Sequence, residues 1–481
     1  MQKILNYIGG EFQEAISGKL LDNVDPSVGK VYSTLPDSAA ADVDLAVRAS
    51  KKAFADWAGM PVENRSKLLN KLADLMERDL EKLALAECID NGKPLWLARE
   101  TDIPRAISNF RFFAAAAQTF THESSGVANR FLNYTLRQPV GIIGCISPWN
   151  LPLYLITWKI APALATGNCV IAKPSEITPM TAFLLCELAE EAGIPAGVLN
   201  MVHGLGGSVG EALSAHPEIK AISFTGGTVT GRKVAATAAP LFKKLSLELG
   251  GKNPNVIFAD CDFDKMIATT VRSSFQNQGQ ICLCGSRILI EKEIYEKFKT
   301  AFVAEVKQLK LGDPLEESSR QGAIVSKVQY EKVLACIELA KQEGGIILCG
   351  GKAIQPVGRC AEGYFIEPTI IENLPANCRT NQEEIFGPVV TIMPFEDEKE
   401  AIQLANSTTY GLAATIWTIN VNKAHRVSAA IDSGIIWINT WMIRDLRTPF
   451  GGVKDSGVGR EGGDDALRFC TEAKNVCLAV E

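Results

Sequence analysis

Short apolar stretches alternate with amphipathic ones along this chain, and this alternation restricts its fold more than any other feature. Four stretches in the first half have the composition of buried strands: residues 140–146, 169–173, 198–202 and 221–225. Residues 179–192 have the composition of a helix. Strands that alternate with helices in this way form a mostly parallel sheet covered on both faces. The sequence therefore predicts an α/β fold.

A second series of the same kind begins after Gly250. Its predicted strands are residues 256–258, 287–290, 389–394 and 435–438, and its predicted helices are residues 262–275 and 293–307. Ahead of both series, residues 68–76 and 102–118 place apolar side chains at helical spacing. A length of 481 residues exceeds one ordinary domain. We therefore predict two α/β domains that meet near residues 249–251.

Composition excludes several classes of protein. Hydrophobic residues make up 47% of the chain and charged residues 22%, which is the usual globular mixture. A net charge of −6, without a cluster of Lys or Arg, argues against a nucleic-acid partner. Thirteen cysteines without regular spacing, and a start without a long apolar segment, predict a cytoplasmic protein.

The most apolar stretch, residues 141–172, contains Lys159 as its only charged side chain. Pro148, Pro152 and Pro162 interrupt it. A membrane-spanning helix needs about 20 apolar residues with an internally bonded backbone. We therefore predict a buried strand, an irregular turn and a buried helix here, and no membrane partner.

Metal and serine-hydrolase chemistry are not expected. The four histidines stand far apart, and none is spaced from Cys, Asp or Glu as a metal ligand. Cys282 and Cys284 flank a single residue, which is too close for the usual structural zinc site. A serine hydrolase is not expected, although residues 206–210 match the short G-x-S-x-G pattern of a nucleophilic serine.

A glycine-containing turn is the first candidate binding element. Residues 222–231 have the pattern of a strand, a turn at Gly226 and Gly227, and the start of a helix. Backbone N–H groups at such a helix start suit a phosphate or pyrophosphate. An ordinary strand-to-helix turn has the same pattern, so both interpretations stay open.

Two further residues are candidates for chemistry. Cys282 ends a polar segment that contains Gly279, although most free cysteines are inert core residues. Glu248 lies between two leucines and just before Gly250 and Gly251, so we expect it to be partly buried. Burial raises the pKa of a carboxyl group and enables it to act as a general base.

Seven motifs in a fixed order decide between these interpretations. They occupy residues 147–150, 173–176, 224–226, 248–252, 277–282, 383–388 and 449–452. In this order the chain resembles the aldehyde dehydrogenase superfamily from end to end. The resemblance implies a Rossmann-like NAD-binding domain (1–118 and 139–249), an α/β catalytic domain (250–449) and a small β oligomerisation element (119–138 and 450–481). It also implies a homodimer or homotetramer.

The family pattern gives each motif a role. It implies that Cys282 is the nucleophile, that Asn150 stabilises the oxyanion, and that Glu248 activates water. It implies NAD as the cofactor, held by Ile146, Ser147, Trp149, Lys173, Ser175, Glu176, Gly206, Gly226, Gly227, Leu249, Glu384 and Phe386. Gly227 departs from the family, which usually has Ser there. An acidic residue at the ribose favours NAD over NADP, because it repels a 2′-phosphate.

A narrower resemblance concerns the substrate. Residues 101–105, 149–153, 282–284 and 441–447 are similar to those of the 2-aminomuconic and 2-hydroxymuconic semialdehyde dehydrogenases. This implies that two arginines grip a substrate carboxylate, in a site formed by Arg105, Arg444, Leu151, Trp158 and Phe450. The alternatives are that the arginines form ion pairs, and that the substrate is betaine aldehyde or an aliphatic aldehyde. A CoA-acylating enzyme and a non-catalytic scaffold of the same fold are further alternatives.

Overall fold

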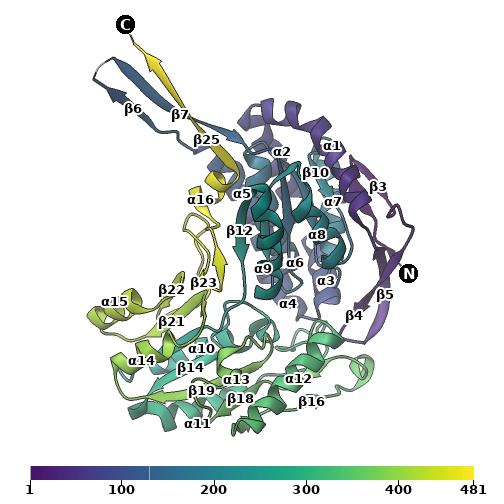
Figure 1. Cartoon of the computed structure of the whole chain (residues 1–481). Helices are drawn as coiled ribbons and strands as arrows, with labels where there is room; N and C mark the ends of the chain where they lie inside the picture. The colour runs from purple at the N-terminus through teal and green to yellow at the C-terminus, as the bar shows by residue number, and fades with distance from the viewer. Residues whose placement is uncertain (1, 129, 481) are drawn as a thin grey trace.

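Two large sheets, one above the other in Figure 1, organise the computed structural model, which describes residues 2–128 and 130–480. The first sheet contains β2 (Asn6–Ile8), β3 (Glu11–Gln13), β8 (Ile142–Ile146), β9 (Cys169–Lys173), β10 (Leu199–Met201), β11 (Ile219–Thr225), β12 (Lys244–Glu248) and β24 (Gly457–Val458). Their order is β24-β12-β11-β8-β9-β10-β2-β3. The strands from β12 to β10 are parallel, and antiparallel pairs close both edges.

Helices cover both faces of the first sheet because its central strands are apolar on both sides. Ile142 and Ile146 of β8 pack against α1 (Ala40–Gly59) in one cluster, whereas Ile143 and Cys145 belong to the cluster on the opposite face. The helices that contact the sheet or each other on these faces are α2 (Val62–Arg78), α3 (Leu80–Asn91), α5 (Ile103–Thr119), α6 (Pro152–Ala165), α7 (Met180–Ala192), α8 (Glu211–Ala215) and α9 (Thr228–Ala238).

The second sheet has the order β15-β18-β19-β14-β13-β21-β22. Its strands are β13 (Pro254–Ile257), β14 (Arg287–Glu291), β15 (Ile346–Cys349), β18 (Thr369–Glu372), β19 (Val389–Phe395), β21 (Ala413–Trp417) and β22 (Ile435–Ile438). Its helices are α10 (Phe263–Phe275), α11 (Tyr295–Val306), α12 (Lys327–Gln342), α13 (Arg379–Gln382), α14 (Glu398–Ala405) and α15 (Val421–Ala430). All its pairs except β15 with β18 are parallel, so both predicted series are present.

The apolar stretch of residues 141–172 forms β8, α6 and β9, as predicted. Every residue of α6 is buried, and Pro152 begins the helix where no backbone donor is needed. With 14 residues, α6 is shorter than a bilayer is thick. Within the described residues, no helix meets the length and hydropathy that crossing a membrane requires.

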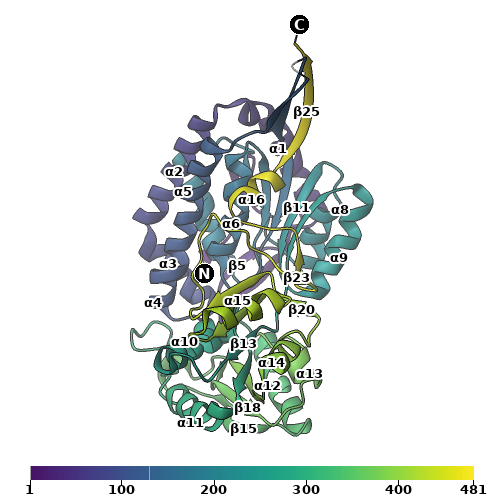
Figure 2. The same ribbon diagram turned by 90° about the vertical axis from the view of Figure 1, so that its left-hand side faces the viewer.

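A three-stranded sheet projects from the body of the molecule and carries the C-terminal strand along its length (Figures 1 and 2). It consists of β6 (Ser124–Val127), β7 (Phe131–Pro139) and β25 (Thr471–Ala479). The other residues after 450 lie elsewhere: β24 extends the first sheet, and α16 (Gly463–Phe469) packs against α5 and α6. The segment 450–481 is thus shared between the layers around the first sheet and the projecting sheet. Its role in oligomerisation stays a prediction.

Smaller elements complete the chain. They are β1 (Gln2–Lys3), β4 (Leu20–Asp25) and β5 (Lys30–Pro36) in one sheet, the pair β16 (Ala353–Ile354) and β17 (Phe365–Ile366), and the pair β20 (Tyr410–Gly411) and β23 (Val453–Lys454). A π-helical turn, η1 (Ala98–Asp102), leads into α5, and another, η2 (Gly206–Gly210), leads into α8.

Candidate active site

The parallel strands of the first sheet end at one edge, and predicted site residues lie at this edge. Ile146 ends β8 and Lys173 ends β9, and these two residues are paired across the strands. Thr225 of β11 and Glu248 of β12 are likewise paired at the ends of their strands. Ligands of doubly wound α/β sheets bind at the carboxyl ends of the strands. The strand ends therefore define the location of the site.

A cavity of about 200 Å³ lies at this edge, between the two sheets. Its lining residues come from five separate segments and from α12: Pro148, Trp149, Asn150, Thr225, Gly226, Gly227, Leu249, Gly250, Cys282, Gln329, Lys332, Glu384 and Phe386. Five of the seven sequence motifs thus contribute to one cavity. Gln329 and Lys332 were not anticipated, because no motif marks α12.

A left-handed turn delivers Cys282 to the cavity. Asn277, Gln278 and Gly279 have φ angles of 52°, 56° and 67°. The Gln278 side chain donates a hydrogen bond of 2.8 Å to the carbonyl of Ala323. A Cβ on Gly279 would lie 2.2 Å from the carbonyl oxygen of Gly387, so only glycine allows this close approach.

Cys282 as a residue is partly exposed, whereas Cys284 is buried. Burial raises the pKa of the Cys282 thiol, and the Glu384 and Glu248 carboxylates raise it further. Burial also raises the pKa of Cys284, to about 12. Cys282 is the thiol that lines the cavity and can reach a bound molecule, but it must lose a proton before it attacks.

Asn150 is buried beside this cysteine, and its side chain is already oriented. Its Nδ2 donates a hydrogen bond of 3.0 Å to the carbonyl of Gln280. Its Oδ1 has no partner among the residues that the structure describes. An amide nitrogen carries two protons, so one remains for a further acceptor. Asn150 can therefore donate to an oxyanion formed next to Cys282.

Glu248 is 4% exposed, and neither of its carboxylate oxygens has a hydrogen-bond partner within the described chain. Burial and then the Glu461 carboxylate raise its pKa well above the usual range. Lys159 opposes this shift. The Lys159 Nζ lies 2.8 Å from Glu461 Oε1 and 3.1 Å from Ser223 Oγ. A buried carboxyl group with a raised pKa suits general-base catalysis.

The strand ends also offer what a dinucleotide cofactor needs. The hydroxyls of Ser147, Thr225 and Thr228 are buried without a partner in residues 2–128 and 130–480. A Cβ on Gly227 would meet nothing within 4 Å, so the start of α9 is open to a ligand. Hydroxyl and backbone donors of this kind bind phosphates. The residues therefore fit a pyrophosphate group.

Other predicted cofactor residues do not line the 200 Å³ cavity. They are Ile146, Ser147, Lys173, Ser175, Glu176 and Gly206. Lys173 forms a salt bridge of 2.9 Å with Glu176, which is partly exposed. Gly206 begins η2 and is exposed.

The segment that contains Glu384 and Phe386 is held in place from both sides. Glu384 Oε1 accepts a hydrogen bond of 2.8 Å from the N–H of Gly251. The Gln329 side chain donates to the Phe386 carbonyl at 2.8 Å. The rings of Trp149 and Phe386 meet edge to face, with 5.1 Å between their centroids. This segment therefore forms a fixed wall of the cavity.

An apolar cluster with two arginines lies next to Cys282. Leu151 and Tyr154 belong to this cluster, and Cys282 packs against it. The Arg444 guanidinium lies 3.7 Å from the centroid of the Phe450 ring, which belongs to the same cluster, and donates a hydrogen bond of 2.8 Å to the Tyr154 hydroxyl. The structure thus brings aromatic and cationic groups beside the candidate nucleophile.

The second arginine, Arg105, lies over two aromatic rings. Its guanidinium is 5.4 Å from the ring centroids of both Tyr154 and Trp158. Its Nε and Nη2 have no hydrogen-bond partner in the described part of the chain. Burial lowers its pKa, with a further contribution from Arg444. Arg105 and Arg444 are neighbouring cations without a salt bridge to any described carboxylate, which favours an anionic ligand.

Comparison with known proteins identifies the family. The model of the aldehyde dehydrogenase family matches residues 12–476. The chain belongs to the aldehyde dehydrogenase family. Its fold is therefore the aldehyde dehydrogenase fold, and it is an oxidoreductase that acts on aldehydes and depends on NAD(P). The predicted family and fold class are confirmed.

Relatives with similar sequences resemble this aldehyde dehydrogenase over nearly its whole length. The 2-aminomuconic semialdehyde dehydrogenase of Danio rerio is 52% identical, over 98% of this chain and 97% of the relative. The 2-hydroxymuconic semialdehyde dehydrogenase of Pseudomonas sp. (strain CF600) is 44% identical, over 99% of this chain and 100% of the relative. An aldehyde dehydrogenase from Bacillus cereus, solved as a complex with NAD+, is 38% identical and has a TM-score of 0.97. The match covers 100% of this chain and 97% of that one.

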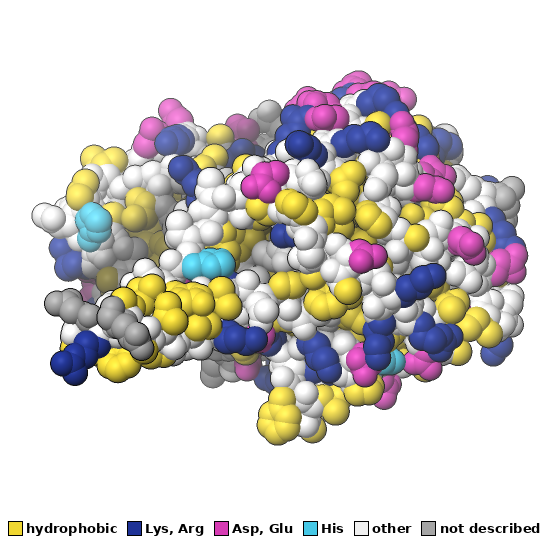
Figure 3. Space-filling view, turned by 90° about the horizontal axis from the view of Figure 1, so that it is seen from above, with side chains coloured by type: hydrophobic (Ala, Val, Ile, Leu, Met, Phe, Trp, Pro, Cys, Tyr) yellow, Lys and Arg dark blue, Asp and Glu magenta, His cyan; other side chains and the backbone are white. Residues whose placement is uncertain are grey.

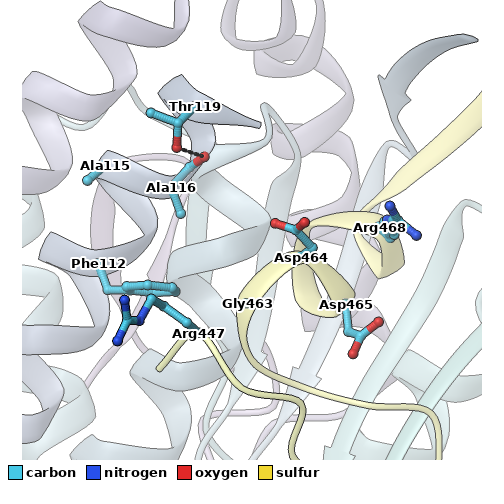
Figure 4. A pocket seen from close by; sticks show the side chains of 9 residues that line it. All are labelled: Phe112, Ala115, Ala116, Thr119, Arg447, Gly463, Asp464, Asp465 and Arg468. Carbon is cyan, nitrogen blue, oxygen red and sulfur yellow. Dashed lines mark hydrogen bonds between the residues drawn. The ribbon is translucent and has the colours of Figure 1, made fainter. Parts of the chain in front are cut away.

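A larger hollow of about 630 Å³ on this aldehyde dehydrogenase has a different character. It lies between α5 and α16, and Figure 4 shows Arg447, Asp464 and Arg468 around it. Arg447 forms a salt bridge with Asp445, and its side chain is 80% exposed. None of the candidate catalytic or cofactor residues lines this hollow. Arg447 therefore belongs to an outer surface, although it is close in sequence to Arg444.

Proposed function

We propose that this aldehyde dehydrogenase oxidises 2-aminomuconic or 2-hydroxymuconic 6-semialdehyde with NAD. The observation that carries the proposal is the pair Arg105 and Arg444. Arg105 has buried donors without a partner in the described residues, and Arg444 lies over Phe450 of the cluster that packs against Cys282. A flat substrate with a carboxylate at one end and an aldehyde at the other fits this arrangement. Relatives named for these two substrates support it.

In the proposed first step, the Cys282 thiolate attacks the aldehyde carbon. A C–S bond forms, and the carbonyl electron pair moves to oxygen. The Asn150 amide and the backbone N–H of Cys282 donate to this oxyanion, which is the charge that develops in the transition state. Asn150 is held for this role by its bond to the Gln280 carbonyl.

A bound nicotinamide dinucleotide supplies the acceptor for the hydride that the adduct loses. The thioester left on Cys282 is then hydrolysed. Glu248 takes a proton from the attacking water, for which its two free oxygens and its raised pKa suit it. The thiol is the leaving group, and the product is a carboxylic acid.

For the cofactor we propose NAD over NADP. Glu176 places a carboxylate at the end of β9, beside Lys173. A carboxylate accepts hydrogen bonds from ribose hydroxyls and repels a 2′-phosphate. The predicted cofactor contacts follow the same proposal, with Ser147, Gly226 and Gly227 near the pyrophosphate, and Glu384 and Phe386 near the nicotinamide.

We also propose that residues 1–118 and 139–249 bind NAD, that residues 250–449 carry the catalytic cysteine, and that the projecting sheet joins subunits into a homodimer or homotetramer. Figure 3 shows apolar side chains gathered on the end of the molecule that carries this sheet. Val127, Phe131, Leu132, Leu136 and Leu478 of its strands are 38–53% exposed. Such a surface suits burial against another copy. The thirteen free cysteines support a cytoplasmic location.

A substrate panel tests the proposal. NADH formation is followed with 2-hydroxymuconic semialdehyde, with hexanal as an uncharged aldehyde, and with betaine aldehyde as a cationic one. We expect the carboxylated substrate to have a kcat/KM at least about tenfold above both others, as one charge-assisted bond predicts. Preference for hexanal or betaine aldehyde contradicts the substrate. Formation of an acyl-CoA when CoA is added contradicts hydrolysis by Glu248.

A further inference from the structure

A buried cluster of three charged side chains lies behind Asn150. Glu87 is on α3, Lys93 follows that helix, and Asp102 ends η1. Their side chains are 0%, 0% and 2% exposed. Lys93 Nζ lies 3.3 Å from Glu87 Oε1 and forms a second salt bridge with Asp102. Removing charged groups from water costs free energy, so the presence of this cluster does not by itself show that it stabilises the fold.

The third contact of the Lys93 ammonium is with the loop that carries Asn150. Its Nζ donates a hydrogen bond of 3.2 Å to the Asn150 carbonyl. An ammonium has three protons, so Glu87, Asp102 and this carbonyl account for all of them. On the other side of the loop, the N–H of Leu153 donates to Glu87 Oε2 at 3.3 Å. The cluster therefore holds the loop of residues 150–153 at both ends.

Two asparagines complete the contacts of the same carbonyl. Asn277 Nδ2 donates to the Asn150 carbonyl at 2.9 Å, and Asn91 Nδ2 does so at 3.4 Å. Asn277 belongs to the left-handed turn that precedes Cys282. The backbone of Asn150 is thus fixed to the segment that delivers the nucleophile, and Lys93 supplies the charged donor of this junction.

We propose that Lys93 is a positioning residue for the oxidation, which holds the Asn150 amide where the oxyanion forms. Lys93 does not line the 200 Å³ cavity, so it acts through Asn150 rather than on the substrate. The proposal rests on the oxyanion role that we proposed for Asn150. A displacement of about 1 Å in a catalytic group costs up to about 100-fold in rate.

The cluster has a second neighbour, which makes the proposal testable. Asp102 is three residues before Arg105, at the start of the helix that carries this arginine. If Lys93 acted through Asp102 and α5, its loss would impair only substrates that use Arg105. If it acts through Asn150, its loss impairs every aldehyde. An uncharged aldehyde such as hexanal separates the two routes.

The test uses Lys93→Met alone and Lys93→Met combined with Asp102→Asn. The combined variant keeps the formal charge of the native cluster, so it avoids leaving two buried carboxylates without a cation. Asp102→Asn alone is the first control, although not a neutral one: Lys93 keeps its bond to the Asn150 carbonyl, so the loss of kcat/KM should be smaller than in the Lys93 variants. Lys243→Met is the second control: this buried lysine also donates to carbonyls, but at the end of β12 opposite Glu248.

We expect kcat/KM for hexanal and for 2-hydroxymuconic semialdehyde to fall by roughly 10- to 100-fold in both Lys93 variants. NAD affinity, measured by fluorescence titration, should change by less than about twofold, because Lys93 is not at the cofactor cavity. Lys243→Met should keep kcat/KM within about threefold, and Asp102→Asn should lose less than either Lys93 variant. A loss confined to the carboxylated substrate, or an equal loss in Lys243→Met, overturns the proposal.

A double-mutant cycle with Asn150→Ala distinguishes positioning from general stabilisation. If Lys93 acts through the Asn150 amide, its substitution in the Asn150→Ala enzyme should cost less than about a further threefold. If substituting Lys93 lowers kcat/KM by the same factor in the native and the Asn150→Ala enzyme, the proposal is overturned. The oxyanion role of Asn150 is then unaffected. An Asn150→Ala enzyme with full activity contradicts the oxyanion role itself, and Lys93 then has no amide to position.

Discussion

The substrate site has a reaction end, at Cys282, and a recognition end, at Arg105 and Arg444. Among the described residues, the reaction end lacks hydrogen-bond donors, whereas the recognition end lacks acceptors. At the reaction end, both oxygens of Glu248 and Oδ1 of Asn150 are acceptors without a donor in the described residues. At the recognition end, Nε and Nη2 of Arg105 are donors without an acceptor there. An unpaired buried polar group costs about 1–3 kcal/mol. Each end is therefore built for a missing partner: a water at Glu248 and a carboxylate at Arg105.

The two ends also differ in the contacts that orient their functional side chains. At the reaction end, a hydrogen bond to the backbone carbonyl of Gln280 orients the Asn150 side chain. At the recognition end, Arg105 and Arg444 rest on aromatic rings, and Arg444 donates to a tyrosine hydroxyl. We infer that chemistry and substrate choice are separable. Changes at the reaction end should affect all aldehydes, and changes at the recognition end only charged ones.

The largest expected effect is at the nucleophile. Cys282→Ala removes the only atom that can form the thioester, so NADH formation should fall to background with every aldehyde. Cys284→Ala is the matched control, because Cys284 is buried and does not line the 200 Å³ cavity. It should keep most of the activity. Steady-state NADH assays measure both, and substantial turnover by Cys282→Ala would falsify the covalent mechanism.

The next effect separates two steps within the reaction end. Glu248→Gln removes the base but leaves Cys282 able to attack. Steady-state turnover should fall by about two to four orders of magnitude, while rapid mixing still shows a first burst of NADH. Glu218→Gln, a substitution at a surface glutamate paired with Lys51, is the control. Full steady-state turnover by Glu248→Gln would show that another group activates water.

At the recognition end the loss should depend on substrate charge. Arg105→Ala and Arg444→Ala each remove a charge-assisted pair worth about 1.5–3 kcal/mol, or roughly 10- to 150-fold in kcat/KM for the semialdehyde. Hexanal should change by less than about threefold. Arg447→Ala is the control, since Arg447 pairs with Asp445 on the outer surface. Equal losses in all three variants with both substrates would mean that these arginines only support the fold.

The sequence predicted some elements to within about one residue, helices 102–118 and 262–275 among them, whereas β12, β18 and β21 were not predicted. Strand 169–173 coincides with β9, because a short apolar run between breaks has few alternatives. Helix α12 was not predicted, although its buried residues Val333, Ile337 and Ala340 stand at the i, i+4 and i+7 spacing of a helix face. No motif marks this segment, so that periodicity was the available signal.

The candidate site was predictable where a motif marks it. Cys282, Asn150 and Glu248 stand in such motifs, and the structure brings Cys282 and Asn150 into one cavity. The salt bridge of Lys159 with Glu461 joins residues 302 positions apart, which no local pattern indicates. Lys159 did stand out as the one charge in residues 141–172. A lone charge in an apolar stretch was therefore the available signal of a buried network.

The pH dependence of hydrolysis gives a smaller effect at the reaction end. The pKa of Glu248 is raised by burial and by Glu461, and the base is the deprotonated form. Below that pKa, kcat should fall about tenfold per pH unit when hydrolysis limits turnover. Glu461→Gln removes one cause of the raised pKa, so the acid limb should move to lower pH. A kcat–pH profile measures this, and a limb that moves to higher pH would contradict it.

The smallest expected effect concerns the cofactor edge of the first sheet, away from both ends of the substrate site. Glu176 is partly exposed and pairs with Lys173. Glu176→Gln removes the charge that opposes a 2′-phosphate and frees the Lys173 ammonium to attract one. A partly exposed charge interaction is worth about 1 kcal/mol, so the ratio of kcat/KM for NAD to that for NADP should fall about fivefold. Glu187→Gln, at an exposed glutamate paired with Lys82, should leave the ratio unchanged. An unaltered ratio in Glu176→Gln would mean that NAD preference is set by the shape of the phosphate site, where Gly227 leaves open space, rather than by this carboxylate.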